Sequence, residues 1–178
     1  DHQVSFGLWI EADSLNNTLS ESVLVDGDPL LYRYGASGET ISGLSLNSPM
    51  NMTNWGEVVI LKSEDITLKS LSITGARGAQ GASGNDFDSK SHPPATSGEE
   101  AVGVRMEDCL GCSLVDVSIE DITGGTGGSG LSAAAPAGAG VGLHVAGCEG
   151  LSVEHLVISH ITGGTGGGTR EGMLSSSA

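Results

Sequence analysis

Apolar residues recur along the chain at a fixed spacing of two, three and two positions. The three clearest sets are Ile66, Leu68, Leu71 and Ile73, then Cys112, Leu114, Val117 and Ile119, then Leu151, Val153, Leu156 and Ile158. Alternation by two predicts a strand with one buried face, and the step of three predicts a residue at which the chain turns. Each set is therefore expected to form two short strands that meet at a corner.

A further apolar alternation precedes each set and predicts a third short strand. These pairs are Val58 and Ile60, Val104 and Met106, and Leu143 and Val145. The best match aligns residues 103–128 with residues 142–167 without a gap. A looser copy covers residues 58–75, and the weakest runs from Leu8 to Gly27, which gives about four copies at spacings of 48, 46 and 39 residues.

Such short strands do not form a stable sheet alone, but stacked copies at about 4.8 Å satisfy the ladder hydrogen bonds of each strand. The sequence therefore predicts parallel stacking around a continuous aliphatic core. A helical bundle is disfavoured, because no segment places apolar residues at i, i+3, i+4 and i+7 over two turns. Glycine and β-branched residues are also poor helix formers.

The repeat resembles the right-handed parallel β-helix repeat shared by pectate-lyase-like proteins and many bacterial and archaeal surface proteins. The resemblance covers most of the chain and implies an all-β fold, a right-handed parallel β-helix (solenoid) with glycine-rich loop excursions from each coil. It identifies a fold more than an activity. Members of this superfamily often stack asparagines at the corner between the second and third strands. Here that column holds Ser22, Ser70, Asp116 and His155, which departs from the family pattern.

Glycine-rich segments follow the copies, at about 76–99, 125–140 and 164–178. One interpretation is a flexible linker, because glycine, serine and alanine bury little surface. The other is ordered packing, because glycine at every second or third residue lets extended, polyproline-like backbones approach closely. We expect order near the coil and disorder toward the loop tips.

Composition and charge narrow the function classes. The 178 residues include 38% hydrophobic residues, enough for one domain over residues 1–178. The net charge of −15 disfavours nucleic acid as a partner. No stretch approaches the roughly 20 apolar residues of a membrane span, so no membrane insertion is expected. The first residues lack a signal-peptide pattern, and the last copy ends within a glycine-rich segment. We therefore expect a segment of a longer chain or assembly.

The three cysteines, Cys109, Cys112 and Cys148, are candidates for stacked thiols. Cys148 occupies the position of Cys109 one copy later. A redox or zinc site would need thioredoxin-like surroundings or further ligands, which the pattern lacks. Buried thiols are expected, and a disulfide that involves Cys148 is the alternative, because stacked residues lie near the permitted Cα separation.

Metal and cofactor candidates are few. Asp86 and Asp88 lie in the most polar loop and could offer oxygen ligands to calcium, although no EF-hand or calcium-binding nonapeptide is present. A solvated acidic surface explains them more simply. His144, His155 and His160 are expected at the surface. No cofactor is predicted.

No catalytic set is predicted. Glycosidases of the resembled fold use clustered carboxylates, and lyases use calcium with a basic residue, whereas this chain has seven basic residues. The leading hypothesis is a non-catalytic structural or adhesive protein, secreted or on the cell surface, that self-associates into filaments or a surface layer. The alternatives are the non-catalytic portion of a polysaccharide-degrading enzyme, or a glycan-binding or ice-binding module. Only the Thr123 and Thr162 column, with Thr74 one position away, offers matching residues for such binding.

Overall fold

The computed structural model describes residues 24–25, 28–29, 31–47, 51–52, 57–84, 94–130 and 134–169. Regular structure in these residues consists of strands. They are β1 (Leu24–Val25), β2 (Asp28–Pro29), β3 (Leu31–Tyr34), β4 (Thr40–Ser42), β5 (Ser45–Asn47), β6 (Asn51–Met52), β7 (Val58–Leu61), β8 (Thr67–Thr74), β9 (Arg77–Gly78), β10 (Ala101–Glu107), β11 (Ser113–Glu120), β12 (Gly140–Ala146) and β13 (Ser152–Ser159).

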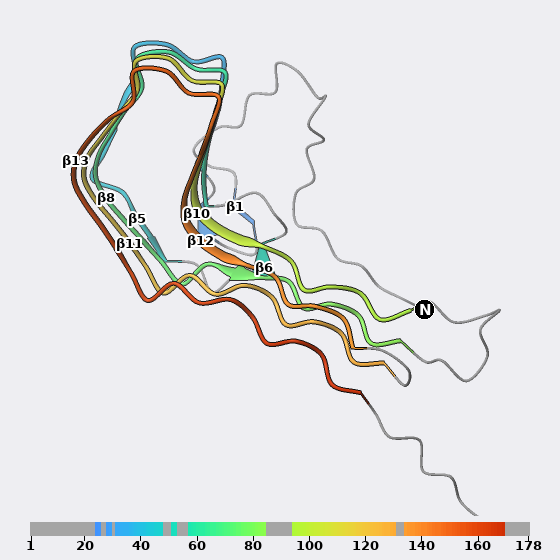
Figure 1. Cartoon of the computed structure of the whole chain (residues 1–178). Helices are drawn as coiled ribbons and strands as arrows, with labels where there is room; N and C mark the ends of the chain where they lie inside the picture. The colour runs from blue at the N-terminus through green and yellow to red at the C-terminus, as the bar shows by residue number, and fades with distance from the viewer. Residues whose placement is uncertain are drawn as a thin grey trace, which may run out of the picture.

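Two parallel sheets dominate the structure (Figure 1). One has the order β12-β10-β7-β3, and the other has the order β13-β11-β8-β4, with β5 also paired to β8. Two small pairs, β1 with β2 and β6 with β9, complete the strands. Each large sheet takes one strand or strand pair from each of four stacked rows. Rows 1 to 4 are residues 31–47, 57–75, 101–122 and 140–161.

Equivalent residues of successive rows pair directly. Leu68 pairs with Leu114, and Leu114 pairs with Val153. In the other sheet, Val58 pairs with Val104, which pairs with Leu143. These registers have the offsets of 46 and 39 residues that the sequence repeat has.

The prediction of a right-handed parallel β-helix with glycine-rich loop excursions is wrong. The described residues form two separate parallel sheets of four and five strands, and no third sheet closes a coil among them. The reason lies at the predicted corner, where Ser70, Asp116 and His155 have φ of 52°, 53° and 51°. A single left-handed residue bends a strand without ending its ladder. The predicted second and third strands are therefore one eight-residue strand in β8, β11 and β13.

The weakest predicted copy, Leu8 to Gly27, is not the row next to residues 58–75. That row is residues 31–47, in which Leu31 pairs with Val58 and Ser45 pairs with Ser72. Of the predicted copy, only Leu24–Val25 is described, and it pairs antiparallel with Asp28–Pro29. Most of that copy, including Ser22, lies outside the described residues.

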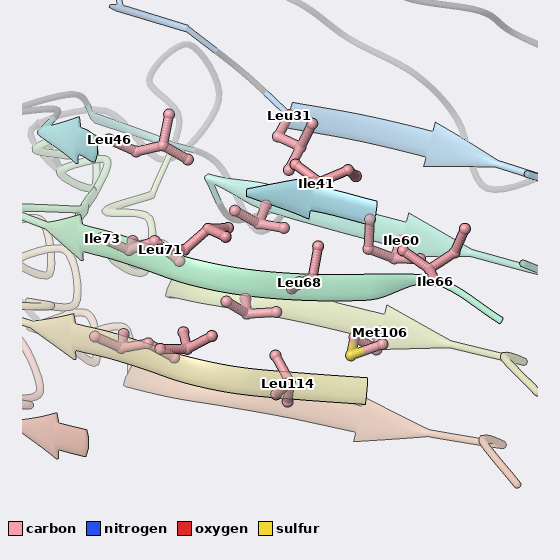
Figure 2. Packing of buried hydrophobic residues seen from close by; sticks show 14 of the residues in the cluster. Leu31, Ile41, Leu46, Ile60, Ile66, Leu68, Leu71, Ile73, Met106 and Leu114 are labelled. Atoms are coloured by element: carbon pink, nitrogen blue, oxygen red, sulfur yellow. The ribbon is translucent and has the colours of Figure 1, made fainter. Parts of the chain in front are cut away.

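One aliphatic core lies between the two sheets. Figure 2 shows Ile60 and Met106 from one sheet and Leu68 and Leu114 from the other, with side chains directed into the shared interior. Full burial of each such side chain stabilises the fold by about 1.5–3 kcal/mol. The sheets approach closely at Gly103, where an added Cβ would meet Cγ2 of Ile119.

The glycine-rich segments are also ordered by backbone hydrogen bonds. After each long strand, the chain runs outward through residues 77–84, 123–130 and 162–169, side by side in Figure 1. The first two segments are joined at every third residue. The N–H groups of Gly78, Gly81 and Gly84 donate to the carbonyl oxygens of Thr123 at 2.9 Å, Thr126 at 2.7 Å and Ser129 at 3.0 Å. This three-residue period is that of a polyproline II helix.

The returning segments, residues 94–99 and 134–139, bond to the outward ones. Gly125 N–H donates to the Glu99 carbonyl at 2.8 Å, and the Gly125 carbonyl accepts from Gly138 N–H at 2.8 Å. We call the outward and returning segments together the glycine layer. The sequence predicts that these segments are ordered near the strands. In the structure, backbone hydrogen bonds continue to residue 84 in the first outward segment and to residue 130 in the second. The tips, at 85–93 and 131–133, lie outside the described residues.

Glycine is required where neighbouring backbones touch. A Cβ on Gly125 would overlap the carbonyl oxygen of Ala79, and a Cβ on Gly138 would overlap that of Glu99. By contrast, a Cβ on Gly163 would find its nearest atom, the Gly138 oxygen, at 3.7 Å. The layer therefore depends on particular glycines rather than on glycine content in general.

Replacement of Gly125 by alanine is expected to lower the free energy of unfolding by about 1–3 kcal/mol, because two backbones must move apart. Thermal unfolding followed by circular dichroism measures this as a lower Tm. Gly163→Ala is the matched control and should leave Tm nearly unchanged. Equal Tm values for the two variants would contradict close packing of the layer.

Candidate functional site

The outer face of the glycine layer carries a regular set of side chains. Every third residue of the outward segments points away from the neighbouring backbones. The set, which we call the hydroxyl face, consists of Arg77, Gln80 and Ser83, then Thr123, Thr126 and Ser129, then Thr162 and Thr165. Polyproline II geometry separates successive side chains by about 9 Å along a segment, and strand spacing separates segments by about 4.8 Å.

Threonines stack in two columns on this face. Thr123 Oγ1 lies 3.2 Å from Thr162 Oγ1. Thr126 and Thr165 are separated by the same 39 residues as Thr123 and Thr162. Their segments are joined beside them, where Gly127 N–H donates to the Thr165 carbonyl at 2.9 Å. The prediction had named Thr123 and Thr162 but missed the second column. Its signal was the Thr-Gly-Gly-Thr-Gly-Gly run, which places a threonine at every third residue.

Thr74 does not join these columns. It ends strand β8 and pairs with Glu120, whereas the residue that pairs with Thr123 is Arg77. The hydroxyl face presents several kinds of hydrogen-bonding group. The hydroxyls of threonine and serine both donate and accept hydrogen bonds, and the guanidinium of Arg77 donates them.

The cysteines lie at the turn between the two sheets. Cys109 and Cys112 are buried and Cys148 is half-buried, and all three are free thiols. Cys148 stacks on Cys109, whose backbone N–H donates to Cys148 Sγ at 3.4 Å. The Cys109 thiol donates to the Glu107 carbonyl at 3.3 Å. Burial raises the pKa of Cys109 to about 12, and the neighbouring thiols of Cys148 and Cys112 add to this rise.

The three predicted surface histidines each face a carboxylate of row 3. His155 Nδ1 lies 3.1 Å from Asp116 Oδ1. His160 Nδ1 lies 3.6 Å from Asp121 Oδ1, and His144 Nε2 lies 3.6 Å from Glu107 Oε1. The side chains of His155 and His160 are largely exposed, and such surface pairs contribute little to stability.

Arg105, in strand β10, forms ion pairs with two carboxylates. Its guanidinium lies 3.0 Å from Glu107 Oε1 and 3.3 Å from Glu100 Oε1. Arg105 therefore holds two carboxylates of its own chain.

Among the residues that the structure describes, no three or more His, Cys, Asp or Glu side chains are arranged so that they could hold a metal ion. The calcium candidates Asp86 and Asp88 lie outside the described residues. In the same described part of the chain, no helix has both the length and the apolar character needed to cross a membrane.

No family model, curated protein or solved structure matches this chain. The resemblance to pectate-lyase-like proteins is therefore neither supported nor refuted by relatives. Inference about function rests on the geometry of the hydroxyl face and of the glycine layer.

Alkaline pH is expected to destabilise the protein through Cys109. Its pKa is 9.0 ordinarily and about 12 in the fold, so the folded state keeps a proton that the unfolded state loses. The stabilisation is complete below pH 9 and is lost as pH rises toward about 12. Denaturant unfolding across this range measures the slope.

Burial also raises the pKa of Tyr32, so the comparison needs a variant that isolates the thiol. Cys109→Ala should show a shallower loss of stability with pH than the unchanged protein. The same slope in both proteins would show that Cys109 is not a buried neutral thiol.

Proposed function

We propose that this is a non-catalytic structural or adhesive protein of the extracellular surface. The observation that carries the proposal is the glycine layer, in which both outward and returning backbones are hydrogen bonded to their neighbours. Such bonding, continuous with two parallel sheets, favours a rigid body over a flexible linker. A rigid body with a regular outer face suits a spacer or an adhesive surface.

The charged groups support the same role. The net charge of −15 favours solubility and disfavours association with other polyanions. Arg105 of row 3 pairs with Glu107 of the same row and with Glu100, which directly precedes the row. The histidine pairs join row 4 to row 3. The histidine pairs thus place charged and polar side chains at the surface of successive rows, and a secreted or cell-surface location fits a body of this kind.

Glycan binding is a second candidate, and the hydroxyl face favours it. Its threonine columns repeat at fixed intervals in two directions, and Arg77 and Gln80 add donors beside them. A polysaccharide offers hydroxyl groups at regular intervals along a chain, so repeated weak contacts could add up through multivalency.

Incubation with neutral and acidic polysaccharides tests the catalytic alternative directly. We expect no release of reducing ends and no unsaturated products, measured by a reducing-sugar assay and by ultraviolet absorbance. Retention on insoluble polysaccharides is measured in the same samples by sedimentation. Time-dependent product formation by the purified protein would overturn the non-catalytic assignment.

Removal of hydroxyls from the second threonine column tests the binding candidate. Thr126→Val with Thr165→Val keeps the side-chain shape, so retention on a bound polysaccharide should fall several-fold without loss of Tm. Thr40→Val, at an exposed threonine of strand β4, is the matched control. Equal retention of the variant and the control would remove the hydroxyl face from the contact.

A further inference from the structure

The hydroxyl face is periodic in two directions. Its side chains form columns that cross the outward segments: Arg77, Thr123 and Thr162, then Gln80, Thr126 and Thr165, then Ser83 and Ser129, followed by Gly168. Positions within a column are about 4.8 Å apart, as in a strand ladder. Columns are about 9 Å apart, which is one polyproline II turn. The face therefore has a short repeat along each column and a long repeat along each segment.

The face lies beside the stack rather than at its end. Its side chains come from three successive outward segments, and those of the middle segment, Thr123 and Thr126, are half-buried between their neighbours. Arg77 and Gln80, in the first of these segments, are exposed. The surface therefore does not depend on which row is the last in the stack.

The two repeats select the direction in which a polymer lies on the face. The spacing of about 4.8 Å within a column is close to the length of one sugar ring along a straight β-1,4-linked chain. A chain that lies along a column thus meets one side chain per sugar. Chains that lay along the segments would be about 4.8 Å apart, which is narrower than a flat sugar ring. The separation of about 9 Å between columns leaves room for parallel chains side by side.

The threonine hydroxyls keep free hydrogen-bonding capacity for such chains. Thr123 Oγ1 and Thr162 Oγ1 lie 3.2 Å apart, so one of the two donates to the other. A hydroxyl donates one hydrogen bond and accepts two, so this pair still has one O–H and several lone pairs. Sugar hydroxyls have the same dual character. The face and a polysaccharide are therefore complementary without any charged group.

The charge on the face favours a neutral partner. Arg77 is the charged side chain of the set, and the net charge of the chain is −15, which repels polyanions. Arg33 and Arg105 are held in ion pairs, whereas Arg77 forms no ion pair within the described part of the chain. Its guanidinium is thus available to donate to sugar hydroxyls at one end of the first column.

We propose that the hydroxyl face binds the surface of a fibrous, neutral, β-1,4-linked polysaccharide, with parallel sugar chains running along its columns. This rests on the glycan-binding candidate of the proposed function and names its substrate class. A single soluble chain engages one column and gains few contacts. A fibre surface engages neighbouring columns together, so that weak contacts add up through multivalency.

Sedimentation of the purified chain with crystalline cellulose and with chitin tests the proposal. We expect retention on at least one of these fibres that exceeds retention on the same polymer in swollen, amorphous form. Soluble oligosaccharides of that polymer should not displace the bound protein. Retention should change less than about twofold between about 50 and 500 mM salt, because screening has little effect on a neutral partner.

Variants of the first column test whether neighbouring columns act together. Thr123→Val with Thr162→Val should lower retention several-fold, and adding Thr126→Val with Thr165→Val should lower it further. Thr40→Val remains the matched control. If the valine variants lower Tm, Arg77→Gln tests the first column at an exposed side chain and should also reduce retention.

The outcomes separate this proposal from the broader glycan-binding candidate. Equal retention on crystalline and amorphous polymer, or displacement by soluble oligosaccharides, would overturn the fibre surface and leave glycan binding in place. Retention on other polysaccharides but on neither fibre would do the same. Dependence on the second column alone would contradict parallel chains. Absence of retention on every polysaccharide would overturn both.

Discussion

The structure depends on one interaction, the backbone hydrogen bond between equivalent residues of successive rows. It joins β8 to β11 and β11 to β13 as an ordinary parallel ladder. It continues through the turn residues, where Asp65 N–H donates to the Leu110 carbonyl at 2.8 Å. It then continues into the glycine layer, where the same row spacing is kept with a period of three residues. Strands, kinks and polyproline-like segments thereby share one stacking direction.

Residue types follow from this constraint. Inside the sheets, each row supplies an aliphatic side chain at the same position, so the core is a set of columns rather than a set of individual contacts. In the glycine layer, backbones on two sides leave no space for a Cβ at positions such as Gly125 and Gly138. In residues 123–130 the side chains other than glycine are therefore those of every third residue, Thr123, Thr126 and Ser129. The hydroxyl face is therefore a consequence of the packing, and its regularity comes from the backbone.

Much of the register could be predicted from the sequence, because the apolar spacing of two, three and two marks equivalent positions. The closure of the coil could not, because the same step of three fits both a corner and a kinked continuous strand, as at Asp116. Row 1 was missed because its link to row 2 lacks a glycine-rich segment, which shortens the offset to 27 residues, from Leu31 to Val58. Ile41, Leu44 and Leu46 still carry the three-and-two spacing that could have found it.

The functional features were harder to predict. The threonine columns can be predicted only if the glycine-rich segments are known to be hydrogen bonded with a period of three residues. That period is what places Thr165 beside Thr126. Burial differs between equivalent positions of successive rows, whereas pattern alone treats Leu114 and Val153 as equivalent. Leu114 is 0% exposed and Val153 is 47% exposed, which separates row 3 from row 4, the last of the described rows.

Site-resolved amide exchange in the glycine layer tests the central claim most directly. If the layer is bonded as described, the amides of Gly124, Gly125, Gly127 and Gly128 exchange slowly, because each donates to a neighbouring segment. The amide of Thr126, on the outward side, exchanges faster, which gives a repeating pattern of two slow amides and one fast amide. Uniform exchange at the rate of an unstructured peptide across residues 123–130 would contradict the account.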